Sequence, residues 1–239
     1  MNYAVIFAGG TGTRMNTKTK PKQFLTLHGK EIIIYTLEHF ENHPDIEGIS
    51  VVCIDGWIDY LKKLVDKYQL KKVKWISPGG NTGQESIYNG LNAMKGEIGE
   101  DSIVLIHDGV RPLIDGELIT RNIETAKQKG RAVTVVEATE TVMVVNEKGE
   151  LVENVDRHKC RFARAPQTYI YKELLKAHEH ARERGINTFI DSATMMQAEG
   201  YTLYPVMGKP ENIKITTPSD FYTFRAIVEA EENSQILGF

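Results

Sequence analysis

The sequence lacks several features that would each indicate a particular class of protein. Its 239 residues include only two cysteines, Cys53 and Cys160, which excludes a disulfide framework, and no cysteine and histidine cluster has zinc-site spacing. We therefore expect two reduced thiols. The formal net charge of −3 gives no basic field that could hold a nucleic acid, so we expect no nucleic-acid partner.

Long apolar runs are also missing. No run approaches the ~20 residues that span a bilayer, and the first residues carry no basic stretch followed by an apolar signal region. We expect a cytoplasmic protein with no membrane partner. With 41% hydrophobic and 26% charged residues the chain can bury a core. No repeat or linker divides it, so we expect one domain, residues 1–239.

Apolar strands alternate with helical patterns along most of the chain. Residues 3–8 (YAVIFA) are typical of a buried strand, and residues 31–43 carry apolar side chains at helical spacing. This pattern predicts an α/β fold with a doubly wound, mostly parallel sheet, whose ligands bind at the carboxyl ends of the strands. Further strands are expected at 48–54, 71–76, 102–108 and 131–138, and further helices at 57–68, 84–96 and 117–130.

Residues 139–158 interrupt this alternation. Two short apolar runs flank NEKGE, which is typical of an inserted β-hairpin. A lone two-stranded hairpin is marginal in water, so it would either reach a second subunit as an arm or fold as a meander onto its own domain. The residues alone leave both alternatives open. After it come two expected helices, at 173–185 and 226–232, and two short extended pieces, at 203–207 and 212–216.

A glycine-rich loop follows the first expected strand in the run FAGGTGTRM, residues 7–15. A dinucleotide fingerprint that starts at Gly10 would need glycine where Met15 stands, and no G-K-[ST] follows to make a Walker A loop. Glycines let backbone amides approach phosphate oxygens closely. The loop favours a nucleoside triphosphate, against the alternative of a glycine turn beside solvated lysines. Positive charge comes from Arg14, Lys18, Lys20 and Lys22.

Motifs spread along nearly the whole chain resemble, in the same order, the cytidylyltransferases that couple CTP to a sugar-alcohol phosphate. The resemblance implies a Rossmann-like nucleotidyltransferase sheet and an acceptor whose own phosphate oxygen attacks CTP. Such a phosphate is largely dianionic at neutral pH, since its second pKa is near ~6, so no general base is needed. The motifs are FAGGTGTRM (7–15), PKQF (21–24), GGNTGQES (79–86), HDGVRP (107–112), ETV (140–142), DR (156–157), APQTY (165–169) and NIKIT (212–216).

The resemblance also implies roles for individual residues. Three cations would act on the triphosphate and the transition state, because this chemistry depends on positioning and positive charge: Arg14, Lys22 and Lys214. The implied CTP-binding residues are Ala8, Gly9, Gly10, Thr11, Gly12, Gly80, Asn81, Ser86, Asp108 and Gly109. The implied acceptor-binding residues are Arg111, Thr141, Arg157 and Asp191. In the family the hairpin arm crosses to the other subunit, which implies a homodimer with exchanged arms in which Thr141 and Arg157 act on the neighbour's site.

Asp108 is the expected metal ligand. It ends an expected buried strand, where an ionised carboxylate is costly unless it is paired or bound to a metal. Mg²⁺ typically uses one or two carboxylates plus substrate phosphates, so Mg²⁺ is the expected cofactor. The alternative is an aspartate that caps the following turn. His107 is expected to be structural, because the reaction needs no acid or base there.

The 79–86 motif departs from the family pattern. Many members have an acidic residue and an arginine where this chain has Asn81 and Gly83, which weakens the expected clamp on CTP. Gln84 is the candidate to replace them. Ile190 stands directly before Asp191, where the family often has threonine, so the residues that meet the acceptor's hydroxyls also differ.

The acceptor is indicated by motifs that conflict. AGGTGTRM, the valine of HDGVRP and the phrase VVEATETV are closer to the ribitol-5-phosphate enzymes. DRHKCRFARAPQ is similar to a motif of the 2-C-methyl-D-erythritol 4-phosphate enzymes, with Arg164 and Ala165 in place of Gln and Thr. We expect D-ribitol 5-phosphate, with 2-C-methyl-D-erythritol 4-phosphate as the alternative.

Two other classes stay open as alternatives. A catalytically silent nucleotide-binding protein is favoured only by the altered 79–86 motif, and the presence of Arg14, Lys22, Asp108 and Lys214 argues against it. A nicotinamide-dependent oxidoreductase is disfavoured by Met15. Release of pyrophosphate from CTP would identify the enzyme, whereas nucleotide binding without release would identify the silent protein.

Overall fold

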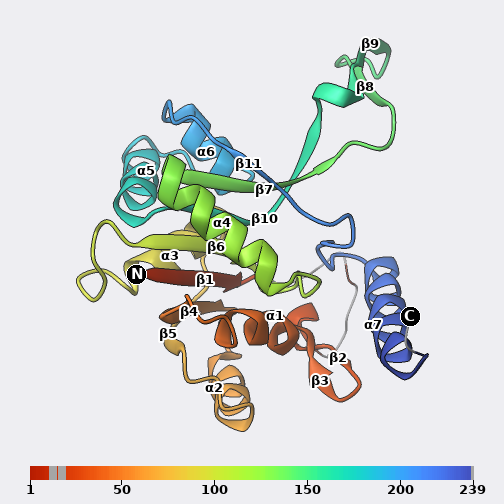
Figure 1. The fold of residues 1–239 in the computed structure, drawn as a ribbon. Helices are drawn as coiled ribbons and strands as arrows, with labels where there is room; N and C mark the ends of the chain where they lie inside the picture. The colour runs from red at the N-terminus through yellow and green to blue at the C-terminus, as the bar shows by residue number, and fades with distance from the viewer. Residues whose placement is uncertain (11–14, 16–19, 238–239) are drawn as a thin grey trace.

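The computed structural model describes residues 1–10, 15 and 20–237, and seven strands within them form one sheet (Figure 1). The strand order is β11-β7-β10-β6-β1-β4-β5. β10 runs antiparallel to both its neighbours, and the other pairings are parallel, so the predicted mostly parallel sheet is confirmed. β10 itself was not predicted. The strands are β1 (Asn2–Ala8), β4 (Gly48–Cys53), β5 (Val73–Pro78), β6 (Ile103–Asp108), β7 (Arg131–Glu137), β10 (Arg161–Ile170) and β11 (Pro205–Met207).

Helices cover both faces of this sheet, as a doubly wound fold requires. On β1, Ala4 and Ile6 pack into one apolar cluster, while Tyr3 and Val5 pack into the other, because successive side chains of a strand point to opposite faces. The first cluster includes side chains of α1 (Ile32–Glu41), α2 (Ile58–Lys67) and α4 (Gly116–Lys129). The second includes side chains of α3 (Gly83–Asn92), α5 (Tyr171–Glu183) and α6 (Ser192–Ala198), of which only α6 was not predicted.

Capping residues set the ends of two of these helices. Asp115 accepts a hydrogen bond from the Leu118 N–H at 2.8 Å and so begins α4. The same helix ends at Gly130, whose φ of 82° lies in the left-handed region that glycine adopts without strain. Thr82 begins α3 by accepting from the Glu85 N–H at 3.1 Å. The start of α3 thereby becomes fixed next to the loop that follows β5.

The C-terminal helix α7 (Pro218–Leu237) packs outside the sheet. Its Phe224 is buried in a small cluster with Ile32, Val110 and Ile215. The Ile215 N–H donates to the Val110 carbonyl at 2.8 Å, and this bond holds residues 212–216 against the loop after β6. These residues belong to no strand, unlike the other expected extended piece, which contains β11.

The expected hairpin projects from the end of the sheet as a separate arm (Figure 1). It consists of β8 (Val142–Val145) and β9 (Leu151–Val155), which pair only with each other. The alternative of a meander packed on its own domain is therefore wrong. Five large apolar side chains of the arm are exposed: Met143, Val144, Val145, Leu151 and Val152.

The two cysteines are free, as expected. Burial raises the pKa of the Cys53 thiol to about 12, which keeps it protonated, and Cys160 is half-buried near the arm. Over residues 1–10, 15 and 20–237, none of the helices has the length and apolar character needed to cross a membrane.

Candidate active site

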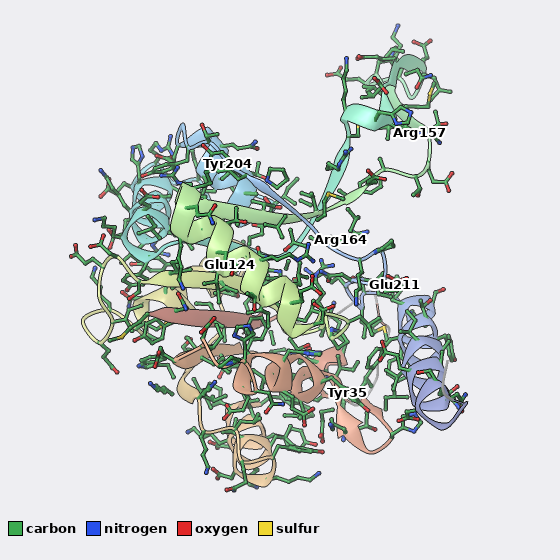
Figure 2. The ribbon with its side chains drawn as sticks, in the orientation of Figure 1. Tyr35, Glu124, Arg157, Arg164, Tyr204 and Glu211 are labelled. Carbon is green, nitrogen blue, oxygen red and sulfur yellow. The ribbon has the colours of Figure 1, made fainter. Side chains whose placement is uncertain are left out.

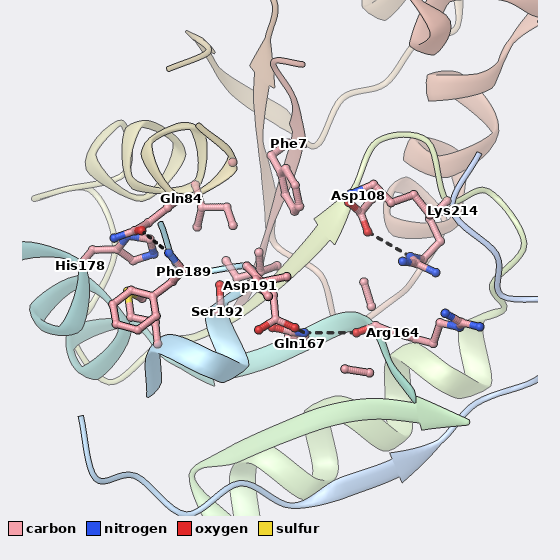
Figure 3. Close-up of a pocket in the computed structure, with 18 residues that line it drawn as sticks. Phe7, Gln84, Asp108, Arg164, Gln167, His178, Phe189, Asp191, Ser192 and Lys214 are labelled. Atoms are coloured by element: carbon pink, nitrogen blue, oxygen red, sulfur yellow. Dashed lines mark hydrogen bonds and ion pairs between the residues drawn. The ribbon is translucent and has the colours of Figure 1, made fainter. Parts of the chain in front are cut away.

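Two adjoining cavities lie at the carboxyl ends of β1 and β6. The first, of about 500 Å³, is called here the glycine-loop cavity. The second, of about 250 Å³, is called the Asp191 cavity and is drawn in Figure 3. The first is lined by residues that include Ala8, Gly9, Gly10, Lys22, Gly80, Asn81 and Ser86, and the second by residues that include Gln84, Arg111, Arg164, Gln167 and Asp191. Both cavities are lined by Phe7, Gly83, Asp108 and Lys214.

Glycines shape the first cavity by allowing two loops to touch. A Cβ on Gly9 would lie 2.9 Å from the Cα of Gly79, closer than real Cβ contacts come. The loop after β1 therefore lies directly on the loop after β5 only because both positions are glycine. Ser86 accepts from the Gly80 N–H at 3.1 Å and fixes the second loop to α3. The predicted Gly9, Gly80, Asn81 and Ser86 are thus brought together.

The side chain of Gln84 faces the other cavity. Its Nε2 donates to the Ile186 carbonyl at 2.9 Å, and its Oε1 accepts from the Phe189 N–H at 3.2 Å. Gln84 lines the Asp191 cavity and not the glycine-loop cavity. The expectation that Gln84 replaces the missing charges of the 79–86 motif is therefore wrong, because its amide is committed to positioning residues 186–189.

Asp108 is held between two cations at the boundary of the cavities. One oxygen lies 2.6 Å from Lys214 Nζ, and the other accepts from Arg111 Nε at 3.0 Å. Burial would raise the pKa of Asp108, but Lys214 and Arg111 outweigh burial and hold that pKa well below its usual range. Because the carboxylate binds side-chain cations rather than backbone N–H groups, the alternative of a turn-capping aspartate is wrong.

Among the described residues that line the cavities, Asp108 is the one acidic side chain that both share. Across the described residues, no three His, Cys, Asp or Glu side chains gather to hold a metal ion. A metal at this point would therefore have to take most of its ligands from elsewhere. That donor set fits Mg²⁺, which accepts one carboxylate together with substrate phosphates and water.

Lys22 and Lys214 approach the first cavity from opposite ends of the chain. Lys22 begins the short 3₁₀ helix Lys22–Phe24, and its Nζ donates to the Ile215 carbonyl at 3.0 Å. Lys214 lies over the Phe7 ring, with Nζ 5.7 Å from the ring centroid. Next to Lys22, Gln23 is buried and donates to the Ala8 carbonyl at 2.7 Å, so it ties PKQF to the end of β1. The sequence motif contained Gln23, but its role was not predicted.

The remaining predicted nucleotide-side residues differ in how they are placed. Arg14, Thr11 and Gly12 lie outside the described residues. Gly109 does not line either cavity, and its N–H donates to the Phe7 carbonyl at 3.0 Å, which holds the start of the loop after β6 against β1. His107 is fully buried, its Nε2 lies 3.0 Å from the Arg111 carbonyl, and burial lowers its pKa to about 3, as expected of a structural histidine.

The predicted acceptor residues fall into two groups. Arg111 and Asp191 both line the Asp191 cavity, where Asp191 caps α6 and accepts from Gln167 Nε2 at 3.0 Å. Thr141 and Arg157 line neither cavity of their own chain. Figure 2 places Arg157 on the arm, away from the body where Arg164 lies, and its Nη1 donates to the Thr139 carbonyl at 3.0 Å.

Sequence reasoning missed part of the second cavity. Gln167 lies in the quoted motif APQTY, and Arg164 was noticed only as a departure from a related motif. Phe189 had no sequence signal, because its place depends on Gln84, which is 105 positions away in the chain. These three residues line the cavity together with Arg111 and Asp191.

Comparison with known proteins gives consistent relatives. A family model described as 2-C-methyl-D-erythritol 4-phosphate cytidylyltransferase matches residues 2–230. The chain is 50% identical to a ribitol-5-phosphate cytidylyltransferase of Vibrio parahaemolyticus, over 100% of both chains. It is 37% identical to a 2-C-methyl-D-erythritol 4-phosphate cytidylyltransferase of Clostridium acetobutylicum, over 96% of this chain and 98% of the other.

A solved structure of a related enzyme has the same fold. The crystal structure of 4-diphosphocytidyl-2C-methyl-D-erythritol synthase from Anaerococcus prevotii superimposes with a TM-score of 0.82, covering 95% of this chain and 96% of that chain at 23% identity. This likeness confirms the nucleotidyltransferase fold. Together with the family model and the full-length relatives, it places the chain in the 2-C-methyl-D-erythritol 4-phosphate cytidylyltransferase family, whose members are CTP-dependent nucleotidyltransferases.

Proposed function

We propose that this enzyme transfers the cytidylyl group of CTP to D-ribitol 5-phosphate, giving CDP-ribitol and pyrophosphate. The observation that carries the proposal is the 50% identity, over the whole chain, to relatives named ribitol-5-phosphate cytidylyltransferase. The pair of cavities supports it, because two phosphorylated substrates must meet at one point, and Asp108 and Lys214 line both cavities.

In this proposal CTP occupies the glycine-loop cavity and the acceptor occupies the Asp191 cavity. An oxygen of the acceptor phosphate forms a bond to the α-phosphorus of CTP, and the bond from that phosphorus to the bridging oxygen of pyrophosphate breaks. No proton has to be removed from the nucleophile. Lys22 and Lys214 hold the negative charge that develops on the leaving pyrophosphate, which is the electrostatic stabilisation that this reaction needs.

Asp108 would hold the Mg²⁺ ion, and the ion would neutralise phosphate charge when bound. Lys214 Nζ lies 2.6 Å from Asp108 in the present arrangement, so Lys214 would move from the carboxylate onto phosphate as the substrates bind. Arg111 keeps Asp108 ionised in either state, since its Nε donates to the other oxygen. Arg14 completes the proposed set of catalytic cations.

The proposal is tested by identifying the product. The purified protein is incubated with CTP, Mg²⁺ and D-ribitol 5-phosphate, and the products are separated, then identified and quantified by mass spectrometry. Formation of CDP-ribitol in equal amount with pyrophosphate is expected. Pyrophosphate without CDP-ribitol would indicate plain hydrolysis of CTP, and neither product would refute the proposal. Omission of Mg²⁺ should abolish both products.

A homodimer with exchanged arms is part of the proposal. The arm exposes apolar side chains such as Leu151, which is 66% exposed, and these need a partner surface. Thr141 and Arg157 lie on the arm, so they would serve the site of a second subunit. The test mixes a Lys22→Ala subunit with an Arg157→Ala subunit. Activity recovered in verified heterodimers, above that of either parent, is expected, and no recovery would contradict the exchange.

The second candidate acceptor is 2-C-methyl-D-erythritol 4-phosphate, favoured by the description of the matching family model and by the 37% identical relative. The same product assay, run with this acceptor in place of D-ribitol 5-phosphate, shows which of the two acceptors the enzyme uses. The expected cytoplasmic location stays a prediction that fractionation of the source cells would test.

A further inference from the structure

Arg164 carries a charge that the described residues do not balance. Its guanidinium is half-buried in the wall of the Asp191 cavity, and its Nε is shielded from solvent without a hydrogen-bond partner. Within the described ranges no carboxylate pairs with it, and its guanidinium carbon lies 5.9 Å from the centroid of the Phe162 ring, a cation–π contact. An anionic ligand would stabilise a half-buried cation of this kind, because one of its donors is shielded from water without a partner.

An irregularity in β10 places Arg164 in the wall of the cavity. Ala163 pairs with Val135 of β7, but Gln167 pairs with Val133, so the register shifts between them and Arg164 falls in the bulge. On the other side, β10 pairs with β6 only from Gln167 onward, opposite Ile106. The two strands therefore separate just before Asp108, and Arg164 lies beside that opening. Bulges next to active sites commonly re-aim a side chain in this way.

The neighbouring charges make this end of the cavity attractive to an anion. Asp108 is already shared by Arg111 and Lys214, and Arg164 lines the same cavity without an ion-pair partner among the described residues. Figure 3 shows Arg164 and Lys214 at the same end of the cavity, while His178 and Phe189 lie at the opposite end. Burial and then the positive charge of Arg111 lower the pKa of Arg164, which means that an anion between the two arginines would relieve their repulsion.

We infer that Arg164 binds the phosphate of the acceptor and positions it for attack on CTP. The inference rests on the proposed function and adds to it a phosphate ligand supplied by the same subunit, separate from the arm. The planar guanidinium can donate to two phosphate oxygens at once and leave a third free as the nucleophile. The motif of the related enzymes noted above has glutamine here, so the arginine is a feature of this chain that bears on its choice of acceptor.

The test compares Arg164→Gln and Arg164→Lys with the unmodified chain. Loss of a charged hydrogen bond should raise the KM for D-ribitol 5-phosphate about 10- to 100-fold in Arg164→Gln, and leave the KM for CTP within about twofold. Arg164→Lys should recover part of the loss. The matched control is Arg225→Gln, which removes the same charge from an exposed pair with Glu229 on α7 and should change neither KM.

Competition by inorganic phosphate shows whether Arg164 binds the phosphate of the acceptor or its hydroxyl groups. Its inhibition constant, measured as competition with the acceptor, should rise in Arg164→Gln in parallel with the acceptor KM. An acceptor KM that is unchanged, a change in the CTP KM instead, or an unchanged inhibition constant would each overturn the inference while leaving the proposed function intact. An unmodified chain that turns over no acceptor would refute the proposed function itself. If Arg164→Gln unfolds, Arg164→Lys decides by the same measurements.

Discussion

The ion pair between Asp108 and Arg111 allows a sharp prediction about stability. The two side chains are 8% and 7% exposed, and Arg111 also donates to the Asn212 carbonyl at 2.7 Å, so its guanidinium is largely shielded from bulk water. Asp108→Asn keeps the shape of the side chain and an oxygen acceptor but removes the negative charge. Arg111 then remains buried as an uncompensated cation, whereas Lys214, which is 41% exposed, can turn to solvent.

The size of the effect follows from this burial. Breaking a buried pair by removing one partner costs about 3–5 kcal/mol of the free energy of unfolding, and since Asn retains an acceptor for Arg111 we expect the lower end, about 3 kcal/mol. The matched control is Asp101→Asn. Asp101 pairs with Lys172 at 2.6 Å but is 83% exposed, and such surface pairs contribute about 0–1 kcal/mol.

Both variants are measured by urea unfolding at neutral pH. Folding lowers the pKa of Asp108, so its contribution to the free energy of unfolding is complete above the ordinary aspartate pKa of 3.8 and is lost as the pH falls below that value. The difference between Asp108→Asn and the unmodified chain should therefore narrow in acid. Equal losses in Asp108→Asn and Asp101→Asn at pH 7 would refute the description of Asp108 as the counterion of a buried arginine.

Three further predictions concern other parts of the molecule. Lys22→Ala should lower kcat by at least about 100-fold, the usual effect of one lost electrostatic stabiliser; unchanged turnover would remove Lys22 from the mechanism. Burial lowers the pKa of His178 from 6.5 to about 3. As the pH falls, the histidine is therefore protonated in the unfolded chain before it is protonated in the folded one, and the free energy of unfolding decreases. Between pH 6.5 and 4.5 the unmodified chain should lose about 2 kcal/mol more unfolding free energy than His178→Gln, and parallel curves would contradict this. A Cβ on Gly90 would lie 2.6 Å from Val5 Cγ1 and 2.7 Å from Val52 Cγ2, so Gly90→Ala should lower the free energy of unfolding by about 1–3 kcal/mol. An unchanged melting temperature would show that the neighbouring strands move aside without loss of stability.

The main sheet could be predicted because its signals are local. The runs 3–8 and 48–54 are apolar and bounded by turn residues, and the helices between them show a regular period. β10 gives a weaker signal, since Pro166 and two arginines interrupt it, and proline within a run argues against a strand. Helix α6 has only seven residues, which is too short for its period to stand out.

The site was predictable where the chain itself supplies the geometry. Gly9 and Gly80 follow two strands of the sheet and Asp108 ends a third, so their meeting at its carboxyl edge could be expected. The hydrogen bonds of Gln84 and the place of Arg164 in the cavity wall could not be predicted, because the first depend on the backbone at Ile186 and the second on a register shift within β10. Such features arise from pairing between distant segments, of which the sequence gives no direct sign.

The arm could be predicted in part. The turn NEKGE and its flanking apolar runs indicated a hairpin, which the structure confirms as β8 and β9. Whether it packs on its own domain depends on whether the body offers an apolar surface within reach, and that property belongs to the whole fold.

The most direct measurement is the rate of pyrophosphate release from CTP and Mg²⁺ with each of the two candidate acceptors, D-ribitol 5-phosphate and 2-C-methyl-D-erythritol 4-phosphate, at matched concentrations. We expect a kcat/KM at least about tenfold higher for D-ribitol 5-phosphate, which corresponds to about 1.4 kcal/mol of transition-state discrimination. A preference for 2-C-methyl-D-erythritol 4-phosphate would contradict the proposed acceptor. Release with neither acceptor, in a protein that still binds CTP, would contradict the proposed reaction itself.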